Sequence, residues 1–282
     1  MLFQLSSVIV KHMNGKTFDL DKLGYRVKTF EPWGINWTNT TVALNKYVVL
    51  NTDSKIQPKS MSLELNVMAH DMTGLQLRFL DLTKVFSGDF DFWIYFAEIP
   101  YIRWQVKVDG EIDFKAVGNA GFGNVTVPLK CMKGIAETTH TTGETFTDGD
   151  ATDYMYGLFG IGTHFELGGD VPQYNFRNAI EFKIYNAGSI PQKADGLHGK
   201  IVVETDGGAD RITIRNNTNK SEFSYSKPFK KLVLDGYLPY VDGKIDFANS
   251  NHGCIDLDRY WNKIAISCNA NFTVMFDMHF YY

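Results

Sequence analysis

The sequence is short of the features that usually reveal a function. Three of its 282 residues are cysteines, and Cys131, Cys254 and Cys268 form no C-x-x-C spacing of the kind that marks a zinc or redox site. We expect reduced, buried cysteines, and a bridge between Cys254 and Cys268 stays open. The net charge of -4 is small, which argues against the strongly basic surface of a nucleic-acid-binding protein.

Long hydrophobic runs and targeting signals are also missing. No apolar run is long enough to span a bilayer, so the sequence predicts no contact with a membrane. The first residues, "MLFQLSSVIVKHMNGK", have no basic stretch before their apolar residues. We interpret them as a first strand and turn rather than a signal peptide. We therefore expect a protein that is made in the cytoplasm and stays there until something releases it.

Motifs for nucleophiles, phosphates and zinc are absent. No G-x-S-x-G, P-loop or Rossmann fingerprint occurs, and no two histidines stand four residues apart. Two carboxylate pairs, Asp89 with Asp91 and Asp256 with Asp258, would point to solvent from one face of a strand. A glycosidase acid needs burial that such positions do not provide. We therefore expect no catalytic residues and no cofactor, and predict that the protein is not an enzyme.

What the sequence does contain is aromatic residues, at 14%, and short alternating segments. Asn14-Gly15 predicts an early hairpin with a type I′ turn, in which both central residues have positive φ. After the alternating segment 61–69 the apolar spacing changes to three and four residues, which predicts one helix over about 71–86. The apolar face of this helix consists of Met68, Met72, Leu75, Phe79, Leu82 and Phe86.

The second half consists almost wholly of short alternating segments separated by turn residues, which predicts an all-β sandwich. Before it, residues 137–153, "ETTHTTGETFTDGDATD", predict an inter-domain connection or a long exposed loop. Asp148, Asp150 and Asp153 of this stretch offer oxygen ligands for Ca²⁺, but the EF-hand order is not met, and a polar linker is the preferred interpretation.

The fold class that we predict is therefore mainly β, with two domains. Residues 1–140 form an α+β domain with a hairpin and one helix, and residues 141–282 form the sandwich. Within the second domain, "EFKIYNAGSIPQ" (181–192) predicts a strand that ends in a turn. There Asn186 and Gly188 would tolerate positive φ, and Pro191 would fix the exit of the chain.

Two groups of aromatic residues indicate binding surfaces. Residues 30–44 place Phe30, Trp33 and Trp37 in a short irregular segment, and such residues are enriched in protein interfaces. A second group lies in turn-rich sequence and could stack against sugar rings, with Asn251, His252 and Arg259 nearby. The competing interpretation of that group is that Trp261 packs into the core. Its members are Tyr237, Tyr240, Tyr260 and Trp261.

The order of these segments resembles the distal tail proteins of siphophages, the long, non-contractile-tailed bacteriophages, that infect Gram-positive bacteria. In the first half the resemblance rests on the hairpin, on the helix "HDMTGLQLRFLDLTKVFSG" and on the strand pair "FDFWIYFAEIPYIRWQVKV", which contains Arg103. In the second half it rests on "FKIYNAGSIPQ", "ITIRNNTNKSEFSY", "KKLVLDG", "YWNKIAIS" and the aromatic end "FTVMFDMHFYY".

The resemblance implies a structural hub. Distal tail proteins form a homo-hexameric ring at the tail tip, which continues the tail tube and lets DNA pass through its lumen. Their C-terminal domain is a galectin-like sandwich that anchors receptor-binding proteins of the baseplate. The implied partners are further copies of the chain, the tail tube protein, a tail-associated protein at the tip and receptor-binding proteins. The implied location is the virion, after assembly in the host cytoplasm.

Two other hypotheses stay open at this stage. The chain could be a carbohydrate-binding adhesion module of a cell-wall-binding protein, with sugar contacts within residues 237–261. A glycoside hydrolase that uses Asp256 or Asp258 is the third hypothesis.

Overall fold

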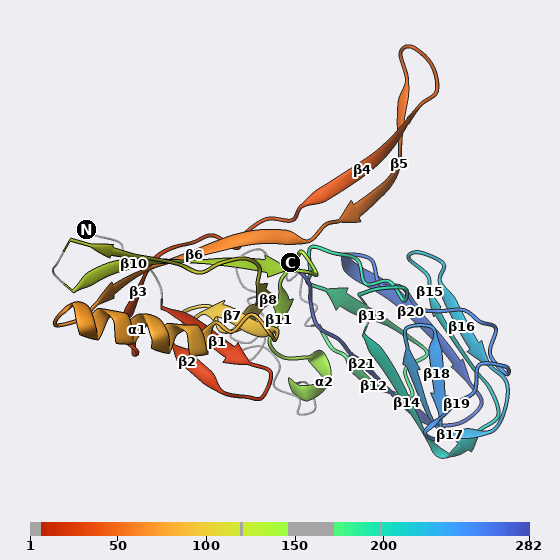
Figure 1. Ribbon diagram of the computed structural model, residues 1–282. Helices are drawn as coiled ribbons and strands as arrows, with labels where there is room; N and C mark the ends of the chain where they lie inside the picture. Colours follow the sequence, from red (N-terminus) through yellow and green to blue (C-terminus); the bar gives the residue numbers. More distant parts are fainter. Residues whose placement is uncertain (1–6, 119–120, 146–171, 198) are drawn as a thin grey trace. The chain divides into compact units, whose positions relative to one another are not determined.

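The computed structural model describes residues 7–118, 121–145, 172–197 and 199–282 (Figure 1). Its fold is mainly β, as predicted, and the chain divides into two compact units, Met1–Ala136 and Glu137–Tyr282. The division lies between Ala136 and Glu137, whereas the sequence analysis places the boundary at residue 140. Asp148, Asp150 and Asp153, the candidate Ca²⁺ ligands, lie outside the described residues.

The N-terminal unit is built on one antiparallel sheet. Two long strands, β6 and β10, pair along their whole length and alternate buried with more exposed residues, so Leu65 and Val125 face each other in the core. The path of neighbouring strands runs β2-β1-β7-β8-β10-β6-β3, and β9 also pairs with β10. The strands are β1 Val8–His12, β2 Thr17–Asp19, β3 Tyr25–Phe30, β6 Lys59–Met68, β7 Phe92–Phe96, β8 Ile102–Val108, β9 Asp113–Val117 and β10 Phe122–Cys131.

The predicted helix is confirmed as α1, Met72–Val85. It begins where the Asp71 carboxylate accepts a hydrogen bond from the Gly74 N–H at 2.7 Å, the usual way to satisfy a free amide at a helix start. Leu75 and Leu82 are fully buried, and the helix packs against β6 and β10. The predicted apolar face is only partly correct, because Met68 is largely exposed at the end of β6.

The first hairpin forms as predicted, but its turn differs. Strands β1 and β2 pair with Lys11 opposite Thr17, so four residues, 13–16, make the connection. Gly15 has positive φ and Asn14 does not, so the predicted type I′ turn is wrong. The longer loop closes instead through a hydrogen bond from the His12 N–H to the Lys16 carbonyl at 2.8 Å.

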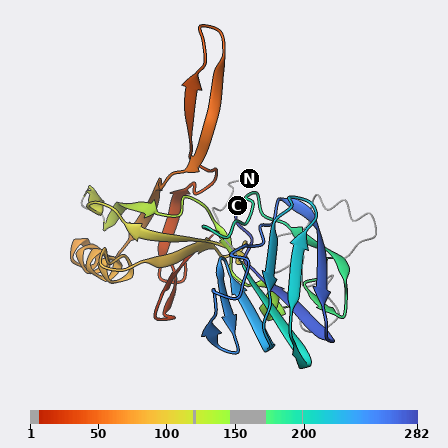
Figure 2. The same cartoon turned by 90° about the vertical axis from the view of Figure 1, so that its right-hand side faces the viewer.

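The C-terminal unit is a sandwich of two antiparallel sheets, as predicted (Figure 2). Both sheets contribute side chains to one core. The six-stranded sheet has the order β12-β21-β14-β17-β18-β19 and the four-stranded sheet the order β13-β20-β15-β16. The first contains β12 Asn175–Arg177, β14 Lys200–Ala209, β17 Phe229–Asp235, β18 Leu238–Val241, β19 Lys244–Ile245 and β21 Phe272–Asp277. The second contains β13 Glu181–Asn186, β15 Ile212–Asn216, β16 Glu222–Tyr225 and β20 Tyr260–Cys268.

The threonine-rich stretch is not an exposed linker over the residues that the structure describes. It forms β11, Glu137–Thr138, and the short helix α2, Thr142–Thr145. Thr138 and Thr142 are buried, and their amides donate to the carbonyls of Phe280 at 2.9 Å and Met278 at 3.0 Å. The alternative of an exposed loop is wrong for these residues, because threonine hydroxyls also accept from backbone amides, as Thr142 does from Met278 at 3.0 Å, so polar side chains became part of the packing.

The turn that follows β13 is also stabilised in another way than the sequence predicts. Neither Asn186 nor Gly188 has positive φ. The buried Asn186 side chain donates to the Ile190 carbonyl and accepts from the Gly188 N–H, each at 3.1 Å. A Cβ on Gly188 would lie 2.7 Å from the carbonyl oxygen of Tyr281, so glycine is needed here for close backbone approach.

Candidate functional site

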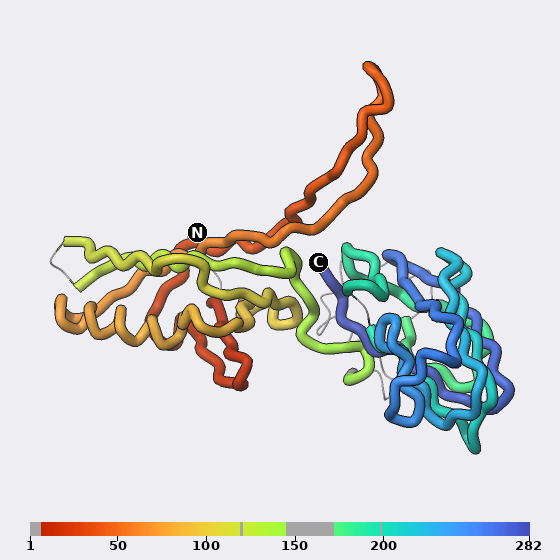
Figure 3. Tube along the Cα trace, turned by 45° about the vertical axis from the view of Figure 1, so that its right-hand side comes forward, coloured from red at the N-terminus to blue at the C-terminus, as the bar shows by residue number. Residues whose placement is uncertain are grey.

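The most unusual feature of the N-terminal unit is a two-stranded hairpin that leaves its sheet, which we call the arm (Figures 1 and 3). It consists of β4, Trp37–Ala43, and β5, Val49–Ile56. Every residue of the two strands is exposed except Ile56, which is half-buried. An isolated two-stranded hairpin is only marginally stable in water, so the arm indicates a surface that is completed by a partner.

The sequence of the arm explains why it still forms strands. Thr38, Thr40 and Thr41 are β-branched, and β-branched residues favour extended backbone. At the tip the Asn45 side chain accepts from the amides of Tyr47 at 2.8 Å and Val48 at 3.0 Å, which closes the turn. A register shift at Thr40 and Thr41 marks a bulge, which increases the local twist.

The two ends of the arm differ in polarity. The stem carries threonine, asparagine and serine, and its two charges, Asp53 and Lys55, are paired at 3.3 Å. The tip is mainly apolar around one lysine, Lys46, and it exposes 85% of Tyr47 and 62% of Val49. Apolar groups that gather at the end of a projection indicate an interaction site rather than a solvated loop. The exposed apolar side chains of the tip are Val42, Leu44, Tyr47, Val48, Val49 and Leu50.

Aromatic residues support the base of the arm. Trp33 stacks on Phe96, with ring centroids 5.5 Å apart and an interplanar angle of 12°, and meets Trp104 edge-on at 5.3 Å. Phe30, one of the predicted interface residues, is buried against Phe96 and Trp104 and belongs to the core of the unit. The other two are about half exposed, Trp33 beside the arm and Trp37 as its first residue.

One lysine joins the two chain segments at this base. Lys59, the first residue of β6, donates through its ammonium to the carbonyls of Pro32 at 2.8 Å and Gly34 at 2.9 Å, and also to that of Trp33. Burial lowers the pKa of this ammonium. Nearby, the Gln57 N–H donates to the Asn36 carbonyl at 2.8 Å, so the entering and leaving strands are tied twice.

The candidate sugar-contact residues do not form one group. Tyr237 and Tyr240 lie at the turn and strand β18 of the six-stranded sheet, whereas Tyr260 and Trp261 begin β20 in the four-stranded sheet. Trp261 is not in the core beside Ile264 and Ile266, because strand alternation places it on the outer face. There it meets Tyr185 of β13, with ring centroids 5.0 Å apart.

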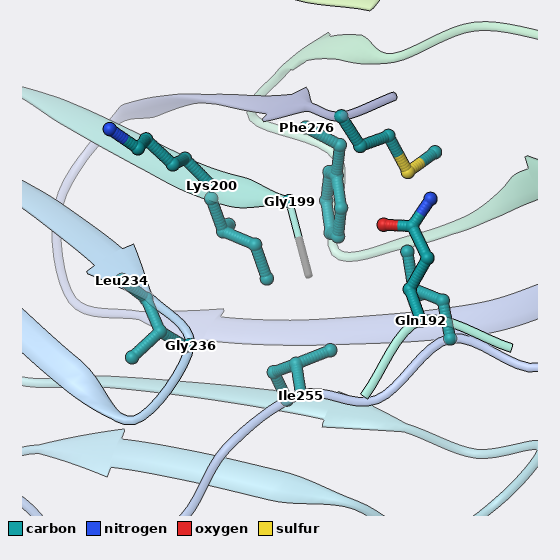
Figure 4. A pocket seen from close by; sticks show the side chains of 10 residues that line it. Gln192, Gly199, Lys200, Leu234, Gly236, Ile255 and Phe276 are labelled. Carbon is teal, nitrogen blue, oxygen red and sulfur yellow. The ribbon is translucent and has the colours of Figure 1, made fainter. Parts of the chain in front are cut away.

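A cavity in the C-terminal sandwich is too small to hold a sugar. Its volume is about 20 Å³, and Gln192, Leu234, Ile255 and Phe276 contribute to its wall (Figure 4). Gln192 donates through Nε2 to the His279 carbonyl at 2.7 Å, while its Oε1 has no hydrogen-bond partner among the described atoms. A space of this size accommodates about one water molecule.

The carboxylate pairs are not arranged as predicted, because none of their four residues lies in a strand. The Asp91 carboxylate accepts from the Gln105 amide at 3.1 Å, and that of Asp256 accepts from the Ala194 N–H at 3.0 Å. All three cysteines are free. Within the described ranges, no group of three or more His, Cys, Asp or Glu side chains could hold a metal ion, and no helix is long and apolar enough to cross a membrane.

Comparisons with known proteins agree with the architecture. The family model of the phage tail protein RIFT-related domain matches residues 16–131, a range that includes the arm. No curated protein sequence matches the chain.

Solved structures resemble the whole chain. The crystal structure of the phage SPP1 Dit (gp 19.1) protein, described as a paradigm of the hub adsorption apparatus in Gram-positive infecting phages, has 11% identity and a TM-score of 0.66. The alignment covers 97% of this chain and 99% of that chain, so the two share a fold. A chain of the phage P2 baseplate in its activated conformation with Ca has 10% identity, coverage of 97% and 98%, and a TM-score of 0.46. The predicted resemblance to siphophage distal tail proteins is confirmed.

Proposed function

We propose that this protein is the structural hub of a siphophage tail tip, and that its N-terminal unit closes into a homo-hexameric ring through the arm. The observation that carries the proposal is the exposed apolar tip on a hairpin with no partner of its own within the described unit. The number of six subunits in the ring rests on the resemblance to distal tail proteins. The phage tail domain and the shared fold with the SPP1 hub support the assignment.

An arm suits ring assembly for a geometric reason. A contact between unlike surfaces of identical subunits repeats until the rotation closes, and closure leaves no unsatisfied copy. Each arm then covers an apolar area on its neighbour, and many modest contacts hold the ring jointly. The ring would continue the tail tube and leave a lumen for DNA. In this role the protein has no catalytic step, and the C-terminal sandwich would anchor the receptor-binding proteins.

The energy at stake can be estimated from the tip. Full burial of a large apolar side chain contributes about 1.5–3 kcal/mol. Tyr47, Val49 and Leu50 are between 47% and 85% exposed, so their burial under a neighbour contributes about 1 kcal/mol each, or ~3 kcal/mol per contact. Loss of this ~3 kcal/mol would lower the affinity of one subunit for its neighbour about a hundredfold.

The test is the oligomeric state of a triple variant, Tyr47→Ser, Val49→Thr, Leu50→Thr. Light scattering after size exclusion and negative-stain images should show six-fold rings for the natural chain and monomers for the variant at the same concentration. The matched control is Ile180→Thr, an equally exposed apolar side chain in the C-terminal unit, which should leave the rings intact. A natural chain that stays monomeric at all concentrations, or a triple variant that still forms rings, would refute the proposal.

A further inference from the structure

The six-stranded sheet of the C-terminal unit carries a row of apolar side chains across its outer face, which we call the apolar row. On β14 both neighbours of Val202 are buried in the core, so alternation directs Val202 outward. The outer face of an antiparallel sheet is usually polar, so apolar side chains from neighbouring strands in one line indicate a contact surface. From β21 to β19 the apolar row consists of Met275, Val202, Val233, Tyr240 and Ile245.

Charged residues flank the apolar row on both sides. On β14, Lys200 lies on one side of the row and Glu204 on the other, whereas β17 has Asp235 beside Lys200 and Lys231 beside Glu204. Both cross-strand pairs form ion pairs within the chain, at 3.3 Å for Lys200 and 2.7 Å for Lys231. The four charges therefore alternate in sign along each strand and across the strands, like a checkerboard. An apolar centre between polar margins is also the arrangement of a protein interface.

This checkerboard is complementary to itself. A two-fold axis presents the same surface of two identical chains to each other. If the axis runs along the apolar row, each apolar residue faces its own copy, and the two charged margins change places. Lys200 then faces Glu204 of the partner subunit, and Asp235 faces Lys231 of the partner subunit. All contacts between the margins join unlike charges, and the ion pairs that already exist become part of a larger network.

We propose that the six-stranded sheet is a self-association surface, through which two copies of the chain pair face to face about an axis along the apolar row. The row supplies apolar area, and the margins select the orientation, because like charges brought together would oppose a shifted pairing. An axis along the strands would match the same charges but lay Ile245 on Asn175, the polar residue beside Met275. The contact does not involve the arm, so it goes beyond ring closure and does not depend on it.

The test exchanges the charges of one margin, Glu204→Lys with Lys231→Glu. This variant keeps the ion pair within the chain but gives every contact with the partner's other margin a like sign. The background is the triple arm variant of the ring test, whose pairing is followed by sedimentation at rising concentration. Most of the apolar row is half-buried, so single chains should pair weakly, with a Kd of roughly 0.1–1 mM, above the concentration of the ring test.

The exchange should raise this Kd roughly tenfold or more. Added salt should weaken pairing of the background chain and strengthen that of the exchanged variant, since it screens attraction in one and repulsion in the other. Exchange of the second margin as well, Lys200→Asp with Asp235→Lys, restores the checkerboard and should restore pairing. The matched control exchanges Arg215 and Glu222, a cross-strand ion pair on the four-stranded sheet, and should leave pairing unchanged.

Hydroxyl-radical footprinting of Met275 and Tyr240 follows the same surface in the natural chain, whether or not rings form. Oxidation of both should fall as the concentration rises. The inference would be overturned by oxidation and mass that do not depend on concentration, which would mean that another segment or another protein covers the row. It would also be overturned by a one-margin exchange that leaves the Kd unchanged, or by an equal rise in the control.

Urea unfolding checks that each variant folds, and a folded variant with both margins exchanged that does not recover pairing would contradict the proposed axis. The two proposals fail separately. Natural chains that form rings without protection of Met275 and Tyr240 would refute the pairing alone. Natural chains that protect these residues but never form rings would refute the hub assignment alone.

Discussion

Replacing Lys59 by methionine tests whether the arm is held in place from its base. Methionine keeps an unbranched side chain of similar length but removes all three N–H donors. In the natural chain these donors bind the carbonyls of Pro32, Trp33 and Gly34, in the segment that leads into the arm. The change therefore removes the hydrogen bonds between the segment before the arm and the segment after it. It keeps the apolar contacts of the side chain.

The magnitude follows from the type and burial of these bonds. A hydrogen bond that involves a charged group contributes about 1.5–3 kcal/mol. The free-energy contributions of the three bonds are not additive, because one ammonium carries a single desolvation cost and the released carbonyls can bind water. We therefore expect the free energy of unfolding to fall by about 1.5–3 kcal/mol in total. Locally, this would raise the equilibrium constant for opening of the arm base by roughly ten- to hundredfold.

Amide hydrogen exchange measures this directly. The Gln57 N–H, which donates to Asn36 at the base, should lose protection in Lys59→Met, while amides of the C-terminal sandwich should not change. Lys55→Met is the matched control, because that lysine pairs only with Asp53 on the exposed stem and should alter stability by less than about 0.5 kcal/mol. Equal protection of Gln57 in both variants would show that Lys59 does not hold the base.

Two further predictions concern the C-terminal sandwich. Gly188→Ala places a Cβ 2.7 Å and 2.8 Å from the Tyr281 backbone oxygen and nitrogen, so urea unfolding should show a loss of about 1–3 kcal/mol, whereas Gly196→Ala, with open space around it, should show almost none. Burial and a hydrogen bond to Asp246 raise the pKa of Tyr225 to about 12. Because this folded-state pKa lies above the ordinary 10, the phenol stabilises the fold below that pH, and the stabilisation is lost as pH rises toward about 12. Tyr225→Phe should remove this part of the alkaline loss in unfolding titrations, and an unchanged profile would contradict it.

The elements that the sequence predicted well are those in which local preference and tertiary packing agree. The spacing of Leu75 and Leu82 indicates one helix face, and the structure buries that face against a sheet. Alternation in β14 and β20 likewise agrees with their burial in the sandwich. Such periods are imposed by the core, so they are visible before the fold is known.

The arm and the contacts between strands could not be assigned in this way. Residues 37–56 resemble any polar loop with a few valines, because both faces of a free hairpin are exposed and no core imposes a period. The partners of Lys59 and the pairing of Tyr185 with Trp261 depend on tertiary contacts and strand register, which sequence alone does not give. The error over the threonine-rich stretch has the same origin, since the partners of Thr138 and Thr142 lie more than a hundred residues away in sequence.

The composition of the arm predicts how a contact made by it would respond to salt. Its tip is mainly apolar around one lysine, Lys46, and the stem charges Asp53 and Lys55 are paired with each other. Burial of apolar area does not depend on screening by salt, so added salt would change only the small part that Lys46 contributes. The ring contact that we propose would therefore persist at salt concentrations that dissociate a contact held mainly by ion pairs.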